Sequence, residues 1–484
     1  MSTNYKTPGV YLVEKNAFAN SVVEVATAIP MFIGYTEKAE YKGESVLNKP
    51  FRISSFADYR AVFGENAQMK FKVSDDEKGT LKVELANSKR RFRLFDAIRL
   101  FYQNGGATCY IMSVGSYNDD IKEDSLKKAL TPFEKEPEPT LVVIPEAVSL
   151  ETADVCANVQ NEMLAHCAKM KNRFAILDVF NGFKEPSEEP EKCIKTFRDA
   201  ITNNLEYGAV YYPWLNTSVV QSNEVTFLNI DPPTDLVTIL KKDVPETATD
   251  ITEQIDKITT TTDDVEVQSV HQTLMMNCPK YPVIMNMIRE QWNLMPPAGA
   301  IAGIYTMVDN SVGVWKAPAN VGINGVITPA VNLSNEEQED LNVPVNGKAV
   351  NAIRTFVGDG NKVWGARTLD GNSQDWRYVN VRRTLIMLEE SIKLASKAFV
   401  FEPNTANTWV TMKGMISNFL TSIWKRGGLA GSTPEDAFEV YVGLGETMTS
   451  EDILDGFLRI TVKVALIRPA EFIEITFQQQ QQKS

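Results

Sequence analysis

Histidine is scarce in this chain of 484 residues, which contains only His166 and His271. A Ser/His/Asp nucleophilic site needs a histidine base. His166 falls in a helical pattern, His271 borders an acidic stretch, and no Gly-x-Ser-x-Gly elbow occurs anywhere in the sequence. We therefore expect that the protein is not an enzyme. If it were a hydrolase, its turnover would be lost when His166 or His271 is replaced.

Paired cysteines are also missing. The number of cysteines is odd, they are widely spaced, and none forms a C-x-x-C pair. We expect buried free thiols rather than disulfides or a zinc site. The acidic pair Asp263 and Asp264 is a weak calcium candidate, and a solvated surface is the better interpretation. Gly358 and Gly360 lack the rest of a phosphate-binding loop and predict a turn. We expect no metal and no cofactor. The cysteines are Cys109, Cys156, Cys167, Cys193 and Cys278.

Long apolar runs and an excess of basic residues are absent as well. No window approaches the roughly 18 apolar residues of a membrane span, and the N-terminus has no basic stretch followed by an apolar one. The formal net charge is −13, the opposite sign from that of a nucleic-acid-binding protein. We expect no nucleic acid partner, no membrane insertion, and folding in the cytoplasm of the producing cell.

What is present is an ordinary globular composition with 43% apolar and 23% charged residues. The length predicts two to four domains of roughly 100–200 residues each. The acid is concentrated between residues 215 and 279, where 11 acidic and 3 basic side chains give a local balance of −8. We interpret residues 217–270 as a solvent-facing insertion or flexible flap that buries little surface. A second insertion, a hairpin, is predicted near residues 68–88.

Strand and helix patterns alternate through the first part of the chain. Such alternation predicts an α/β layer with a partly parallel sheet. The predicted strands are 28–34, 109–113, 140–144 and 174–178, and the predicted helices are 51–64, 95–104 and 155–168.

The last quarter of the chain predicts a small α+β unit. Two amphipathic helices are followed by two alternating strands, near residues 438–442 and 458–466. The apolar helix faces are Leu385, Leu388, Ile392, Ala395 and Phe399, then Trp409, Met412, Ile416, Phe419 and Ile423.

Both ends of the chain have strand-like patterns without a neighbouring partner. A lone strand leaves backbone groups unpaired, so it pairs at a distance, either within the subunit or at the sheet edge of another copy. The residues concerned are Val10, Tyr11, Leu12, Val13, Val22, Val23 and Val25 at the start, and Phe472, Ile473, Ile475 and Phe477 at the end.

Ten peptides, in order along the chain, resemble the contractile-tail sheath family of phages and related injection systems. Residues 68–88 and 217–270 do not match this family and are interpreted as insertions. The peptides are TPGVY (7–11), VATAIPMFIG (25–34), FYQNGGATCY (101–110), AVYYPW (209–214), PPAG (296–299) with AGIY (302–305), GVWKAPAN (313–320), VWGARTL (363–369), YVNVRR (378–383), FEPN (401–404) and RPAEF (468–472).

The resemblance implies a sheath subunit that stacks as six-membered rings around an inner tube and contracts from a metastable extended state. It implies an α/β middle domain with a subtilisin-like fold but no active site, an α+β C-terminal domain, and N- and C-terminal strand arms exchanged between subunits. The expected division is an N-terminal arm (1–27), the α/β sheath domain (28–365), the C-terminal domain (366–470) and a C-terminal arm (471–484).

The partners implied by the resemblance are further copies in a helical sheath, paralogous sheath subunits, the inner tube protein, and baseplate and tail terminator or cap proteins. Lys413, Lys425 and Arg426 fit an inner-tube contact and a solvated helix face equally well. The resemblance implies that the sheath assembles in the bacterial cytoplasm and then forms part of a phage tail or an extracellular contractile particle. The sequence is also compatible with a membrane-anchored contractile system. The alternative function is a surface carbohydrate-binding or adhesive module that uses the acidic insertion.

Overall fold

The structure is a computed structural model, and it describes residues 21–76, 79–188, 192–245 and 248–476. Within these ranges no helix has both the length and the apolar character needed to cross a membrane.

The described chain forms two compact units. We call residues 26–386 with 468–476 the α/β unit, and residues 21–25 with 387–467 the C-terminal unit. The polypeptide therefore passes from one unit to the other three times, after residues 25, 386 and 467.

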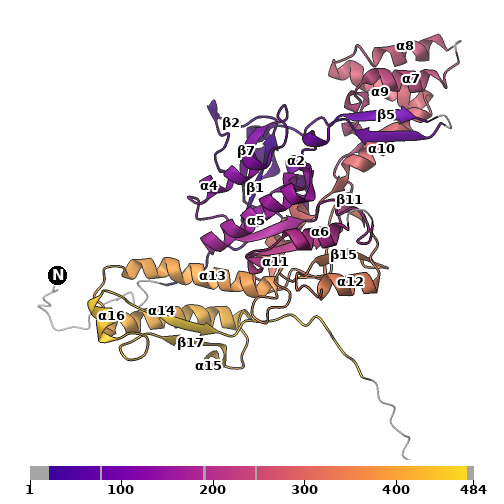
Figure 1. Cartoon of the computed structure of the whole chain (residues 1–484). Helices are drawn as coiled ribbons and strands as arrows, with labels where there is room; N and C mark the ends of the chain where they lie inside the picture. Colours follow the sequence, from indigo (N-terminus) through magenta and orange to yellow (C-terminus); the bar gives the residue numbers. More distant parts are fainter. Residues whose placement is uncertain (1–20, 77–78, 189–191, 246–247, 477–484) are drawn as a thin grey trace, which may run out of the picture. The chain divides into compact units, whose positions relative to one another are not determined.

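A nine-stranded sheet lies at the centre of the α/β unit (Figure 1). Its six inner strands run parallel, whereas the strands at both edges are antiparallel. The parallel-rich sheet confirms the predicted α/β layer. The spatial order is β13 (Val321–Gly322), β16 (Gly360–Val363), β15 (Asn351–Phe356), β10 (Gly208–Tyr212), β9 (Phe174–Asp178), β8 (Leu141–Val143), β1 (Pro30–Thr36), β7 (Cys109–Ser116) and β4 (Phe51–Ile53).

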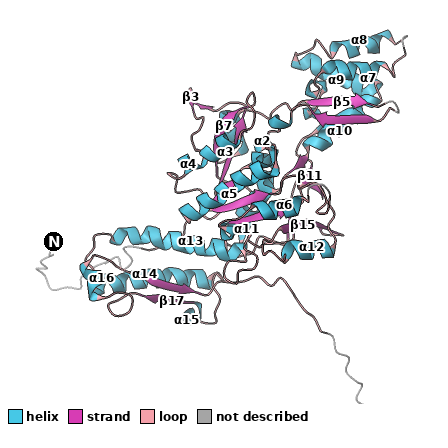
Figure 2. Ribbon diagram, viewed as in Figure 1, coloured by secondary structure: helices cyan, strands magenta, loops and turns pink. Residues whose placement is uncertain are grey.

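Helices cover both faces of this sheet (Figure 2). Strand β1 is buried throughout, because Met31 points into one apolar cluster and Phe32 into the other. The helices that contribute to the cluster of Met31 are α3 (Glu123–Lys128), α4 (Leu130–Phe133), α5 (Ala153–Met170), α6 (Cys193–Ala200), α12 (Asn335–Asn342) and, through Ile386, α13 (Val379–Ser396). Those that contribute to the cluster of Phe32 are α1 (Phe56–Phe63), α2 (Leu94–Gln103), α11 (Ala298–Ser311) and, through Val379, α13.

One predicted helix begins later than expected. Residues 51–53 pair with β7 as strand β4, and the Ser55 side chain accepts a hydrogen bond from the Asp58 amide at the start of α1. The N-cap therefore places the helix start at Phe56 instead of residue 51.

Smaller elements complete the α/β unit. They are the antiparallel sheet β12 (Leu294–Met295), β11 (Leu215–Thr217) and β14 (Val326–Pro329), the hairpin β2 (Glu40–Tyr41) and β3 (Glu44–Ser45), and the 3₁₀ turns η1 (Ser88–Arg90), η2 (Pro145–Ser149), η3 (Leu205–Tyr207), η4 (Ser222–Glu224) and η5 (Phe227–Asn229). A further 3₁₀ turn, η6 (Lys397–Phe399), belongs to the C-terminal unit.

The two predicted insertions fold together as one subdomain, which is visible beside the central sheet in Figure 1. The Asp231 amide donates a hydrogen bond of 2.9 Å to the Phe71 carbonyl, and the Asn229 side-chain amide donates one of 3.0 Å to the Met69 carbonyl. The elements are the hairpin β5 (Phe71–Asp75) and β6 (Leu81–Leu85) with helices α7 (Pro233–Lys241), α8 (Thr249–Lys257), α9 (Asp264–Asn277) and α10 (Lys280–Trp292).

The prediction that residues 217–270 bury little surface is wrong. Leu236, Leu240, Ile255 and Val270 are at most 1% exposed in an apolar cluster of their own. The acidic and threonine-rich composition hides this core, because its apolar residues recur at helical spacing within a polar background. The hairpin predicted near residues 68–88 is confirmed.

The C-terminal unit contains a helical layer and a two-stranded antiparallel sheet. The predicted face of its long helix is confirmed, since Met412, Ile416, Phe419 and Ile423 are buried. Strand β18 is shorter than the predicted 458–466. The elements are the second half of α13 (Val379–Ser396), α14 (Ala406–Lys425), α15 (Pro434–Ala437), β17 (Phe438–Tyr441), α16 (Ser450–Leu454) and β18 (Thr461–Val464).

Candidate functional site at the roots of the terminal arms

The two histidines have structural partners. His166 is 4% exposed, and its Nε2 lies 2.7 Å from Arg173 Nη1. Burial, followed by the charge of Arg173, lowers the pKa of His166 to about 4. His271 Nδ1 lies 2.8 Å from the Tyr281 hydroxyl. In the described part of the chain neither ring contacts a serine, so no nucleophilic triad forms.

The candidate calcium residues also have a structural role. Asp263 caps helix α9 and accepts hydrogen bonds of 3.1 Å from the amides of Val265 and Glu266. Across the described ranges no group of three His, Cys, Asp or Glu side chains is placed to hold a metal ion. All five cysteines are buried free thiols, as predicted.

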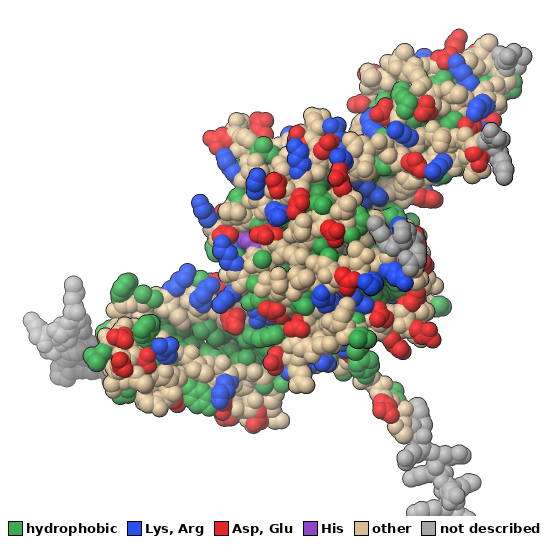
Figure 3. Space-filling view, in the orientation of Figure 1, with side chains coloured by type: hydrophobic (Ala, Val, Ile, Leu, Met, Phe, Trp, Pro, Cys, Tyr) green, Lys and Arg blue, Asp and Glu red, His purple; other side chains and the backbone are tan. Residues whose placement is uncertain are grey.

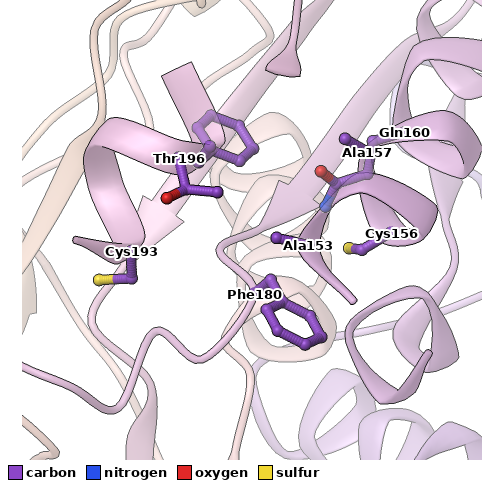
Figure 4. A pocket seen from close by; sticks show the side chains of 8 residues that line it. Ala153, Cys156, Ala157, Gln160, Phe180, Cys193 and Thr196 are labelled. Atoms are coloured by element: carbon purple, nitrogen blue, oxygen red, sulfur yellow. The ribbon is translucent and has the colours of Figure 1, made fainter. Parts of the chain in front are cut away.

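One cavity lies between helices α5 and α6, lined by Cys156, Gln160, Phe180 and Cys193 among others (Figure 4). Its volume is about 10 Å³, at the lower limit for holding a single water molecule. The cavity is therefore a packing gap, too small for a cofactor or an organic substrate.

The N-terminal arm joins the α/β unit at a buried ionic contact that includes Thr27. Arg383 donates to both carboxylate oxygens of Asp309, at 3.0 and 2.5 Å, and both side chains are 3% exposed. The same guanidinium donates to the Thr27 carbonyl at 3.0 Å. Thr27 Oγ1 donates in turn to Asp309 at 2.5 Å. We call this group the N-terminal root.

The C-terminal arm begins at a second buried arginine. Arg367 donates to Glu471 through Nε at 2.9 Å and through Nη2 at 2.5 Å, and the Tyr378 hydroxyl donates to the same carboxylate at 3.2 Å. The remaining nitrogen, Nη1, donates to the Asn342 carbonyl at 2.9 Å. The Arg367 side chain is 4% exposed and that of Glu471 is 17% exposed. We call this group the C-terminal root.

Beyond the C-terminal root the chain is extended and uncovered. Phe472, Ile473 and Ile475 are 77%, 79% and 70% exposed and belong to no strand of the described chain. Phe477 lies outside the described residues. Their pairing with another copy therefore stays a prediction.

Residues just before the N-terminal root contact the C-terminal unit, to which they belong. The Val25 amide donates to Ser391 Oγ at 3.1 Å. Val22 is half-buried, Val23 is 75% exposed, and none of the three valines lies in a strand of the described chain. The other predicted arm residues, Val10, Tyr11, Leu12 and Val13, lie outside the described residues.

The predicted inner-tube residues lie on and after helix α14 of the C-terminal unit. Lys413 and Lys425 are exposed. Arg426 forms an ion pair with Glu24, so it already has a partner within its own unit. An inner-tube contact of these three residues stays a prediction.

Sequence reasoning found part of the two roots. Thr27, Arg367, Arg383 and Glu471 lie in peptides that carry the family resemblance, although no role was assigned to them. Asp309 was missed. The only signal for Asp309 is a single carboxylate in the otherwise uncharged helix α11, and such a residue in a buried helix is a candidate partner for a distant arginine.

Comparisons with known proteins cover nearly the whole chain. The phage tail sheath protein central domain matches residues 119–369, and the phage tail sheath C-terminal domain matches residues 372–480. The PVC sheath complex of an extracellular contractile injection system, in its contracted state, is 29% identical over 99% of both chains with a TM-score of 0.62. The contracted helical sheath of the anti-feeding prophage is 28% identical over 99% of this chain and 100% of its own, with a TM-score of 0.61.

A curated relative matches over a shorter stretch. The tail sheath protein of Enterobacteria phage T4 is 28% identical over 135 residues, which are 28% of this chain and 20% of the T4 protein. This chain thus spans about a fifth of that relative's length. The matched proteins are structural sheath proteins, which confirms the prediction of a structural protein and not an enzyme. The chain belongs to the phage tail sheath family.

Proposed function

We propose that this chain is the repeating subunit of a contractile sheath, which stacks as six-membered rings around an inner tube. The observation that carries the proposal is an exposed apolar arm that starts at a buried ionic contact. Phe472, Ile473 and Ile475 lie in water directly after Glu471, whose carboxylate is held by Arg367. Covering each apolar side chain contributes on the order of 1.5–3 kcal/mol, so a partner surface is favoured.

The two-stranded sheet of the C-terminal unit would be the receiving surface for this arm. Strands β17 and β18 pair with each other, and in the described chain neither has a further strand along its outer edge. The buried Val440 lies opposite Val462 on the side that faces the helices. Ile473 and Ile475 alternate with Glu474, the period of a strand with one covered face. Addition of the arm to this sheet in another copy would pair its backbone and cover its apolar residues.

The two roots support the exchange of arms between subunits. An arm that joins neighbours during contraction must not slide relative to its own subunit. Buried, multiply hydrogen-bonded ion pairs resist such sliding, because separation would leave an arginine buried without a partner. The N-terminal arm, residues 1–27, and the C-terminal arm, residues 471–484, would thus each transmit force from a fixed point.

Contraction in this proposal needs no nucleotide or cofactor. A difference of a few kcal/mol between two packings of one subunit suffices, since it repeats over many copies while a barrier holds the extended state. The partners would be other sheath copies or paralogues, the inner tube protein, and the baseplate and terminator or cap proteins. Assembly would take place in the bacterial cytoplasm, before the sheath becomes part of a phage tail or an extracellular particle. The α/β unit would be the subtilisin-like middle domain without an active site.

Electron microscopy of the purified full chain tests the proposal. The double variant Ile473→Asp, Ile475→Asp should remain folded by circular dichroism but form no striated tubes, because charged side chains cannot be covered in the shared sheet. The matched control Ile473→Val, Ile475→Val keeps the strand apolar and should form tubes like the wild type. Unchanged tubes in the Asp variant, or a wild-type chain that stays discrete, as a carbohydrate-binding or adhesive module would, contradict the proposal.

A further inference from the structure

A basic hollow lies beside the start of the C-terminal arm. It has a volume of about 420 Å³ and is lined by Gln374, Arg377, Tyr378, Arg468 and Pro469. All of these residues belong to the α/β unit. Two of the five are arginines, so the hollow presents two positive charges.

Neither arginine is neutralised within the described chain. Arg377 and Arg468 form no ion pair with any described carboxylate, in contrast to Arg367 and Arg383 nearby in sequence. The Nε of Arg377 is buried and has no hydrogen-bond partner among the described residues. A buried donor left without a partner is unfavourable by about 1–3 kcal/mol. Both guanidinium groups thus line the hollow without a compensating negative charge from the described chain.

We propose that this hollow binds a carboxylate of the copy that receives the C-terminal arm. This inference rests on the proposed function, since it assumes that the arm adds to the sheet of β17 and β18. Only four residue steps separate Arg468 from Phe472, about 13 Å at a strand rise of ~3.3 Å. The surface of the receiving copy that borders its sheet would therefore lie within reach of the hollow.

Charge selects the β17 side of the receiving sheet. On the β18 side, Arg459 is paired with Asp452 and Lys463 with Glu439, so the carboxylates there are already engaged by cations of their own unit. On the β17 side, Glu435 precedes the strand and Glu446 follows it, and both are exposed. Neither forms an ion pair among the described residues. Glu446 Oε2 accepts a hydrogen bond of 3.0 Å from the Val442 amide, which leaves its other oxygen for the hollow of a second copy. A contact between two different surfaces repeats from copy to copy, which suits a helical array.

A charge-swap experiment tests this contact in the full chain. The variant Arg377→Glu, Arg468→Glu should reduce the yield of sedimentable tubes roughly tenfold, because like charges would face each other. The matched control Arg377→Lys, Arg468→Lys keeps both positive charges, and its yield of sedimentable tubes should fall much less. Adding Glu435→Arg or Glu446→Arg to the reversed variant should restore tubes, and the position that restores them reports the direction in which the arm runs along β17.

Three outcomes separate this inference from the proposed function. Normal tubes from the reversed variant, or failure of both Glu435→Arg and Glu446→Arg to restore them, would overturn the contact. If the double reversal disturbs folding, Arg468→Glu alone serves, because Arg468 is exposed and its replacement leaves the core intact. If Ile473→Asp, Ile475→Asp abolishes tubes while the arginine reversals do not, arm exchange stands and the basic hollow is not part of it.

Discussion

Asp309 and Arg383 are joined by two hydrogen bonds while both side chains are 97% shielded from water, and the same pair holds Thr27 from both its carbonyl and its hydroxyl. The carboxylate is 74 residues from its arginine and 282 residues from the threonine. A single buried ion pair thus ties Thr27, the last residue of the N-terminal arm, to two distant parts of the α/β unit.

Removing one member of this pair should destabilise the α/β unit strongly. Asp309→Asn or Arg383→Met alone is expected to lower the free energy of unfolding by about 3–5 kcal/mol, because the other charge stays buried without its partner. In the double variant the free energy of unfolding should fall by less than the sum of the decreases in the two single variants. Urea unfolding followed by fluorescence measures this cycle.

The exposed pair Arg52 and Glu138 provides the control, with side chains 51% and 37% exposed. Its double-mutant cycle should give at most about 1 kcal/mol. Equal coupling energies for the exposed and the buried pair would contradict a special role of the N-terminal root.

Weakening the C-terminal root should release the chain around Glu471. In Glu471→Gln the carboxylate loses its charge, and hydrogen bonds to a charged group are typically stronger by a kcal/mol or more than neutral ones. Cleavage after Phe472 by chymotrypsin should accelerate roughly tenfold, since the protease needs residues on both sides of the bond in extended form. Glu474→Gln, three residues further along and exposed, should be cleaved at the wild-type rate. Equal rates for both variants would show that the root does not restrain the arm.

Acidification should favour the folded chain through Glu146. Burial raises the pKa of this carboxyl from 4.5 to about 7, although its Oε1 accepts hydrogen bonds from the amides of Arg93 and Leu94. Between pH 4.5 and 7 the folded state thus binds a proton that the unfolded chain lacks. This contribution to stability is present below pH 4.5, and it is lost as the pH rises through 7.

The difference in Tm between wild type and Glu146→Gln measures this contribution. The variant keeps an acceptor oxygen but no longer titrates, so the difference should change between pH 5 and 7.5, with the variant gaining relative stability at the higher pH. Glu162→Gln, at an exposed position, should follow the wild type at every pH. Comparing variants is necessary because His166, with its pKa lowered by burial to about 4, acts in the opposite direction between pH 6.5 and 4.

The two insertions should open together. Phe71 is 2% exposed in the core of the inserted subdomain, and Phe71→Ala is expected to remove about 3–5 kcal/mol of local stability. Hydrogen exchange should then increase in helices α7 to α10, more than 140 positions away in sequence, and remain unchanged in α5. Lys72→Ala, at the exposed neighbouring position, should leave hydrogen exchange unchanged in all of these helices. Faster exchange confined to the hairpin would mean that the two segments fold independently.

The C-terminal unit, which contains the open edges of β17 and β18, also exposes large apolar side chains. Val400, Phe401 and Val410 are between 61% and 102% exposed, and Figure 3 shows many apolar side chains at the surface of this unit. Apolar surface of this kind is typical of an interaction surface. It agrees with a subunit that reaches its final state only in an assembly.

Prediction from sequence succeeded where a local pattern carries the information. The period of two along β17 and the apolar face of α14 are set by residues close together in the chain, so they can be read without knowing the fold. Average composition misled for residues 217–270, because a few apolar residues at helical spacing, such as Leu236 and Ile239, suffice to build a core.

The sequence by itself determined the helices, the strands and the peptides that mark the family, since these depend on near neighbours. Only the tertiary structure decided that Thr27 meets Asp309 and Arg383, and that Glu471 meets Arg367. Ion pairs between residues so far apart follow from how the sheet and helices bring the chain together, and a single charge at each position leaves no periodicity to detect.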